Sequence, residues 1–162
     1  MATITTLSGG TADRNTPSRQ VYFIEKEIDF AVAATAKGSA LVATDVIEAI
    51  SVPVSTVILN AGLQVVTVAT GESNDTTLDL GTGVDVDNFV DGFDLDAAAA
   101  GAYAQNAAAF QPIVVGTTAD TIDLLIATAT TAPTGGKVRV WALLMDVEPR
   151  LVATDVDRDQ LA

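Results

Sequence analysis

Alternation of apolar and polar residues runs through several stretches of this chain and predicts β-strands. It is clearest over residues 20–30, where Tyr22, Ile24, Ile28 and Phe30 fall on one side together with a lysine. The acidic residues of this stretch fall on the other side, with a valine and a second phenylalanine. A period of two residues is typical of a strand with one buried face. We therefore expect a half-buried strand here.

Further strands follow from the same reasoning, and turn-forming residues separate them. The longest candidate covers residues 56–70, where Gly62 indicates either a bulge or bend, or a hairpin turn. Residues 31–37 are compatible with a helix or a strand, and the alanine-rich residues 97–109 with a short helix. The remaining strand candidates are residues 40–52, 76–80, 110–115, 120–130 and 137–147.

Seven or eight short strands with polar turns and little helix predict an all-β fold, an antiparallel β-sandwich that is jelly-roll-like. A parallel α/β fold is not expected, because crossover helices of about a dozen residues are missing. We predict one β-sandwich domain over residues 20–147. It is flanked by an extended N-terminal arm, residues 1–19, and a C-terminal tail, residues 148–162.

The composition excludes several kinds of chemistry, because the chain contains no cysteine and no histidine. Disulfides, thiolate nucleophiles, Cys/His zinc sites and imidazole bases are therefore impossible. Carboxylate or lysine chemistry stays open. A pair of carboxylates could hydrolyse glycosides, but no aromatic residues bracket such a pair in the sequence. We expect a non-enzymatic protein with no catalytic residues and no cofactor.

The net charge of −13 is unevenly distributed. Residues 38–136 contain twelve acidic residues and no lysine or arginine, so all eight basic residues lie before or after this stretch. Such an acidic body repels nucleic acids and anionic membranes, and we expect neither as a partner. The alternative is that the charge only keeps the surface solvated. The sequence begins without the features of a secretory signal and contains no apolar run of roughly 18 residues, so we expect neither Sec export nor a membrane span.

Residues 81–96, called here the acidic loop, form the one constellation with metal-binding chemistry. Calcium takes about six to eight oxygen ligands, which neighbouring aspartates can supply. The spacing differs from that of an EF-hand loop, because position five would be Phe89. We expect that the loop does not require calcium; the alternative is a solvated loop anchored in the core by Phe89 and Phe93. The candidate ligands are Asp85, Asp87, Asn88 and Asp91.

Five segments carry a resemblance to a known family. They are DVIEAISVP (45–53), VILNAGLQVVTVATG (57–71), TTLDLGTG (76–83), ADTID (119–123) and GKVRVWALLMD (136–146). With these strand and turn patterns the chain resembles small head or virion structural proteins of tailed bacteriophages, over residues 45–147. The resemblance implies a capsid decoration (cement) protein, often a trimer at a local threefold axis, that binds the outer surface of a capsid and stabilises it.

The resemblance also implies a partner, the major capsid protein, and a location, the virion, after assembly in the host cytoplasm. The competing class is a trimeric fibre or spike, or a carbohydrate-binding β-module for cell attachment, which exposed aromatic residues on one face would favour.

Three groups of residues are candidates for contacts with such partners. The basic arms could reach a partner that the acidic body would repel, and small alanine side chains would let neighbouring backbones approach in a homotrimer. Trp141, the only tryptophan, is expected in the core or at a subunit contact. Capsid-contact candidates are Arg14, Arg19, Arg150 and Arg158, and oligomer-contact candidates are Ala97, Ala98, Ala99, Ala100 and Tyr103.

Overall fold

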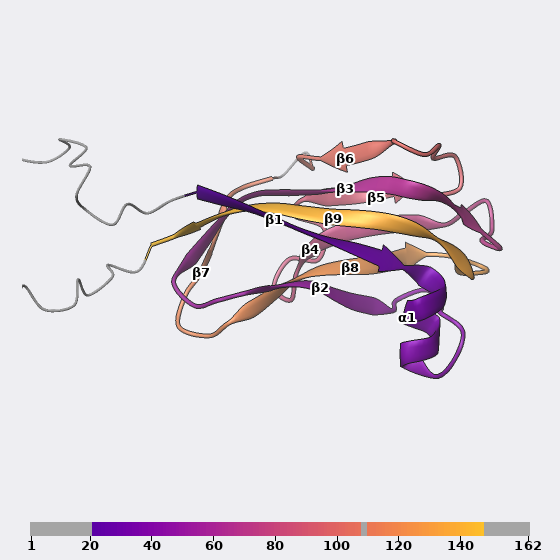
Figure 1. Ribbon diagram of the computed structural model, residues 1–162, viewed down its shortest axis with the longest axis horizontal. Helices are drawn as coiled ribbons and strands as arrows, with labels where there is room; N and C mark the ends of the chain where they lie inside the picture. The colour runs from indigo at the N-terminus through magenta and orange to yellow at the C-terminus, as the bar shows by residue number, and fades with distance from the viewer. Residues whose placement is uncertain (1–20, 108–109, 148–162) are drawn as a thin grey trace, which may run out of the picture.

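The computed structural model describes residues 21–107 and 110–147, and it contains two antiparallel sheets packed face to face (Figure 1). Sheet I has the order β1-β9-β3-β6, and β7 also pairs with β3. Sheet II has the order β2-β8-β4-β5. The elements are β1 (Val21–Asp29), α1 (Phe30–Lys37), β2 (Val46–Val52), β3 (Thr56–Thr70), β4 (Thr77–Thr82), β5 (Val90–Asp94), β6 (Tyr103–Gln105), β7 (Ile113–Val115), β8 (Asp120–Thr128) and β9 (Gly135–Asp146).

The core lies between the sheets and is built from alternate positions of the central strands. In β9 every second residue is buried, and β8 buries Ile122, Leu124 and Ile126 in the same way. Side chains from alternate positions point to one face of a strand, so each sheet contributes one apolar face. The predicted all-β antiparallel sandwich is thus confirmed.

The single helix of the described residues, α1, follows β1 directly and resolves the ambiguity over residues 31–37. Asp29 caps its start by accepting hydrogen bonds from the N–H groups of Ala31 (3.0 Å) and Val32 (3.3 Å). Gly38 ends it in the left-handed region, at φ 79°. The strand predicted over residues 20–30 therefore stops at Asp29, and Phe30 enters the core from the helix.

Several predicted boundaries were wrong. The acidic loop contains a strand, β5, which pairs with β4. The alanine-rich segment forms no helix within its described residues; it makes turns and then the short strand β6, because its backbone pairs with the edge of β3. Strand β3 continues through Gly62, which excludes the hairpin alternative, and its bulges lie on either side of that residue. Strands β2 and β7 are shorter than predicted, and no helix in the described part is long and apolar enough to cross a membrane.

Candidate functional site

Strand β1 is exposed on both of its faces, which overturns the expectation of a half-buried strand. Val21 and Phe23, on the outer face of sheet I, are 49% and 58% exposed. Tyr22 and Ile24, on the face turned toward sheet II, are 39% and 37% exposed, and Ile28 alone is buried. The reason is position: β1 is the edge strand of sheet I, so most of its inward face lies over the rim of the sandwich.

The register of the strands gathers apolar residues on the outer face of sheet I. Val21 lies opposite Met145, and Phe23 lies opposite Leu143. On the other side of β9, Met145 lies opposite Val57 of β3. Contiguous exposed apolar surface of this kind marks an interaction site more often than scattered single residues do. This surface, called here the apolar band, comprises Val21, Phe23, Val57, Val114, Trp141, Leu143 and Met145.

Trp141 lies at the end of the apolar band nearest Glu25 and is held there from two sides. Its ring stacks on that of Phe23, with centroids 6.1 Å apart and planes 20° apart. On β3 it lies against Gly62, where a Cβ atom would come within 2.6 Å of both the indole Cζ2 and the carbonyl oxygen of Ala104. Glycine is therefore needed at this position for the indole to rest on the strand. The structure places Trp141 on the outer face, partly exposed, and not in the core.

Beyond the apolar band, the same face carries ion pairs between β1 and β9. The Lys137 ammonium lies 2.9 Å from Glu27 and 3.6 Å from Asp29, and Arg139 lies 3.8 Å from Glu25. The hydrogen bond to Glu27 raises the pKa of Lys137 above its ordinary value. Exposed pairs of this kind contribute little to stability, so they set the charge of the face more than its stability.

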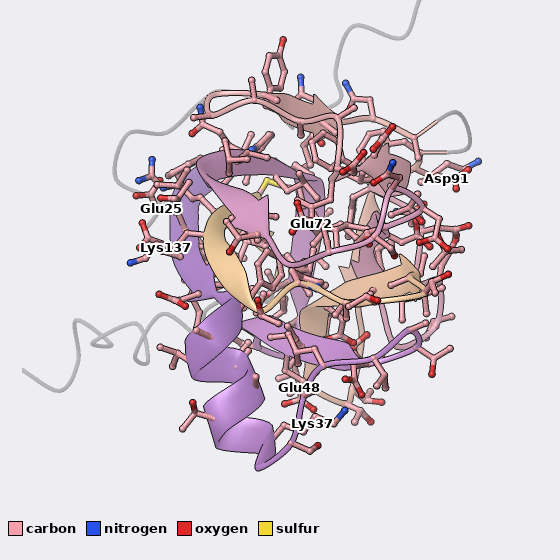
Figure 2. All side chains as sticks on the ribbon, turned by 90° about the vertical axis from the view of Figure 1, so that its right-hand side faces the viewer. Glu25, Lys37, Glu48, Glu72, Asp91 and Lys137 are labelled. Atoms are coloured by element: carbon pink, nitrogen blue, oxygen red, sulfur yellow. The ribbon has the colours of Figure 1, made fainter. Side chains whose placement is uncertain are left out.

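All lysines and arginines of the described residues lie on β1, α1 or β9. They comprise Lys26 and the two basic residues of β9, together with Lys37, which pairs with Asp45 at 2.6 Å. That pair lowers the pKa of Asp45, chiefly through the hydrogen bond from the lysine. Figure 2 shows Glu25 and Lys137 on one side of the molecule and Asp91 on the opposite side. Among the described residues the surface is thus polarised, with charges of both signs at β1, α1 and β9 and acids alone elsewhere.

The outer face of sheet II is acidic. Glu48 of β2 lies directly opposite Asp123 of β8, and Asp79 of β4 lies on the same face. Asp123 is only 9% exposed, and its pKa is raised, first by burial and then by the charges of Asp120 and Glu48. Burial also raises the pKa of Asp79, and Asp91 and Asp87 raise it further. These acidic side chains repel one another, and the sequence contains no basic residue between positions 38 and 136.

The acidic loop does not bring its candidate ligands together as a metal site. A hydrogen bond with Asp87 raises the pKa of Asp85, and the charges of Asp91 and Asp87 raise the pKa of Asp79. No group of three or more His, Cys, Asp or Glu residues suited to a metal ion occurs among the described residues. Phe89 is fully buried and Phe93 packs against the core, so the predicted anchors are confirmed.

A hollow of about 830 Å³ separates the acidic loop from residues 111–120. Asp85 and Asp120 line it, and none of the described lysines or arginines does. Asn88 in its wall donates to the carbonyl oxygen of Gln111 (3.0 Å) and accepts from the N–H of Gln111 (3.4 Å). Asn88 therefore holds two loops together rather than offering ligand atoms.

The residues predicted to make partner contacts fall in different places. Of the alanine group, Ala98 is buried, whereas Ala97, Ala99 and Ala100 are exposed in the turns before β6. Tyr103 is 67% exposed and lies opposite Gln64, on the same outer face as the apolar band. The four candidate arginines, Arg14, Arg19, Arg150 and Arg158, lie outside the described residues.

Sequence comparisons with family models and with curated proteins found no match. Solved structures of similar fold do exist. A chain of the cyanophage Pam1 capsid asymmetric unit is 15% identical, with 89% of this chain and 97% of that chain covered and a TM-score of 0.64. A chain of the Ralstonia phage GP4 capsid is 19% identical, with 78% and 84% covered and a TM-score of 0.59. A chain of the acidic stable capsid of Helicobacter pylori bacteriophage KHP30 is 14% identical, with 77% and 86% covered and a TM-score of 0.53. At these identities the comparisons show a shared fold.

Proposed function

We propose that this chain is a non-enzymatic virion structural protein that binds the outer surface of a phage capsid and stabilises it, as a decoration or cement protein. The observation that carries the proposal is the fold, which is shared with chains of three phage capsid structures over 77% to 89% of this chain. The partner is the major capsid protein, and the location is the virion. The absence of histidine and cysteine from the chain supports a role without catalysis.

The polarised surface supports one orientation on the shell. The apolar band lies where β1 begins and β9 ends, at one end of the sandwich (Figure 1). The chain continues from these strands into residues 1–20 and 148–162, which hold Arg14, Arg19, Arg150 and Arg158 as candidate shell contacts. The acidic outer face of sheet II then points toward solvent, away from the packaged nucleic acid, whose phosphates would repel it.

We further propose a homotrimer. Ala97, Ala99 and Ala100 are small and exposed in the turns before β6, and exposed Tyr103 follows them, so two subunits could approach closely there. Analytical ultracentrifugation at micromolar concentration should give the mass of three chains. A monomer under these conditions would overturn the trimer without touching the capsid assignment.

A carbohydrate-binding or fibre module remains the second candidate, because three aromatic residues share the outer face of sheet I. They are Phe23, Trp141 and Tyr103. A sugar platform needs free ring faces, whereas Phe23 and Trp141 stack on each other. We therefore expect surface glycans of the host to leave Trp141 fluorescence unchanged. A saturable change at millimolar glycan or below would favour the second candidate.

The capsid assignment is tested with capsids of the encoding phage that lack this protein. Full-length protein, a variant without residues 1–19, and variants with one arginine of the arms changed to alanine are added in turn. Occupancy and the heat stability of the capsid are then measured. We expect the single arginine changes to have little effect and the deletion to reduce occupancy strongly, because it removes contact area as well as charge. Equal occupancy with and without residues 1–19 would refute the role of the arm, and no binding by the full-length protein would refute the capsid assignment.

A further inference from the structure

The first residues of β1 expose apolar side chains on both faces of sheet I at once. Val21 and Phe23 point outward, whereas Tyr22 and Ile24 point toward sheet II, and each of the four is at least 37% exposed. A partner that docked on the outer face would cover the first pair and leave the second pair in water. Only a partner that reaches around the edge of the sheet covers both pairs.

We infer that the edge of β1 that no described strand pairs with is an acceptor for an extended segment of the capsid shell protein, which adds to sheet I as a further strand. This inference rests on the proposed function and names the contact by which that function is carried out. Strand addition satisfies backbone N–H and C=O groups along the edge, and side chains of the added strand cover both faces. In this arrangement Phe23 and Ile24 are buried together.

The edge of β1 has few of the features that usually block strand addition. Edge strands are commonly protected by being short, by bulges, by proline or by an inward-pointing charge. Strand β1 has nine residues in nine consecutive pairs with β9, without a register shift and without proline. Its inward-pointing charge, Lys26, comes after the apolar residues 21–24 and leaves them open.

Charge argues for a different protein, and against a second copy of this chain, as the occupant. Antiparallel pairing of β1 with β1 of another copy over all nine residues would set Glu25 opposite Glu25. Moving the register by one residue on each strand would set Lys26 opposite Lys26. Like charges directly opposite each other are destabilising. The register with Ile24 opposite Ile24 avoids these pairs, but it sets Glu25 opposite Phe23 and Glu27 opposite Val21 and so leaves the apolar residues without apolar partners.

The order of side chains along β1 predicts which residues the added strand must carry. Opposite residues 21–24 it needs apolar side chains on both faces, and opposite Glu25 and Glu27 it needs basic or polar ones. Glu25 pairs with Arg139, and Glu27 pairs with Lys137. Both ion pairs are exposed and weak, so the two glutamates remain able to accept a further cation.

Two matched variants separate strand addition from docking on the face. Phe23→Lys adds a charge to the outer face, and Ile24→Lys adds one to the inner face. Val46→Lys is the control, because Val46 is an exposed apolar residue, 53%, on β2, an edge strand of sheet II. All three positions are partly exposed in the free protein, so we expect unchanged circular dichroism. Phe23→Lys also removes the stacking on Trp141, so its melting temperature should fall by a few degrees at most.

Capsids lacking the protein are titrated with each variant, and hydrogen exchange of the β1 amides is followed on binding. We expect both β1 variants to need about tenfold or more protein for half-occupancy, the control to match the wild type, and β1 amides to become protected in the complex. If Ile24→Lys binds as tightly as the wild type, strand addition is wrong and the occupant covers the outer face alone. If instead the free protein dimerises and Ile24→Lys abolishes the dimer, the occupant is a second copy. Failure of the wild type to bind would refute the proposed function itself.

Discussion

Asp123→Asn should stabilise this protein at neutral pH, although it removes a nearly buried charged group. Asp123 lies directly opposite Glu48 across the β2–β8 pair, and Asp120 adds a second like charge. Side chains of directly opposed residues have Cβ atoms about 5 Å apart. Two charges at that distance repel by about 1 kcal/mol in water and about 3 kcal/mol at an effective dielectric constant of about 20.

The expected net gain is toward the lower end of this range, because Glu48 can turn toward solvent and salt screens the repulsion. Asparagine keeps the acceptor for the Thr121 hydroxyl, which now donates to Asp123 at 2.6 Å. A gain of about 1 kcal/mol in the free energy of unfolding corresponds to a rise of about 2–4 °C in melting temperature for a chain of this size. Asp96→Asn, in an exposed turn, is the control for a change in net charge alone.

The pH dependence gives this prediction a second, independent check. The pKa of Asp123 is raised above its ordinary value of 3.8 in the folded protein, so its ionised form costs stability. As the pH falls through the raised pKa, the wild type protonates Asp123 and recovers that stability, whereas the asparagine variant does not titrate there. In low-salt urea denaturation, the difference between the two proteins should therefore be largest at pH 7 and vanish near pH 4. A variant less stable than the wild type at pH 7, or a difference independent of pH, would refute this electrostatic reasoning.

Three further predictions concern other parts of the structure. Gly62→Ala should destabilise the protein by about 1–3 kcal/mol in urea denaturation and shift the emission of Trp141, because the new Cβ overlaps its indole; unchanged emission would contradict the packing. Asp75→Asn should lower the melting temperature at pH 7, because hydrogen bonds from Ser73 and Thr130 lower the pKa of Asp75 to about 2 and so stabilise the folded protein. The stability from the ionised Asp75 is present above pH 3.8 and is lost as the pH falls through about 2. Equal melting temperatures of variant and wild type at pH 7 would contradict this prediction. Excess EDTA should leave the melting temperature unchanged, and a fall of several degrees would require a metal site in the acidic loop.

The central strands were predictable from sequence because each has one face in the core. Alternation in β9 is such a case, and its buried residues occupy even-numbered positions from 138 to 144. The same parity places the odd-numbered Trp141 on the outer face, a signal that was present in the sequence and not used. For α1 the capping residues Asp29 and Gly38 were also visible, and they decide between helix and strand.

The exposure of β1 could not be predicted in the same way. Its alternation looks like that of a half-buried strand, and only the strand order shows that it lies at an edge with little beneath it. The helix predicted for the alanine-rich segment was wrong for a related reason. Alanine favours an α-helix, but pairing with β3 gives the backbone of this segment other hydrogen-bond partners. Such pairing joins residues distant in sequence, so it leaves no local pattern. The candidate site depends on the same long-range register, which brings Val21, Met145 and Val57 into one row.

The most direct test of the proposed function is a cryo-electron microscopy map of the native phage particle. We expect the β-sandwich on the outer surface of the capsid, with β1 and the apolar band against the major capsid protein and the acidic face of sheet II toward solvent. An additional strand from the shell protein should run along the edge of β1 that no described strand pairs with. A map in which the sandwich is absent from the shell, or in which the acidic face contacts it, would contradict the proposed function.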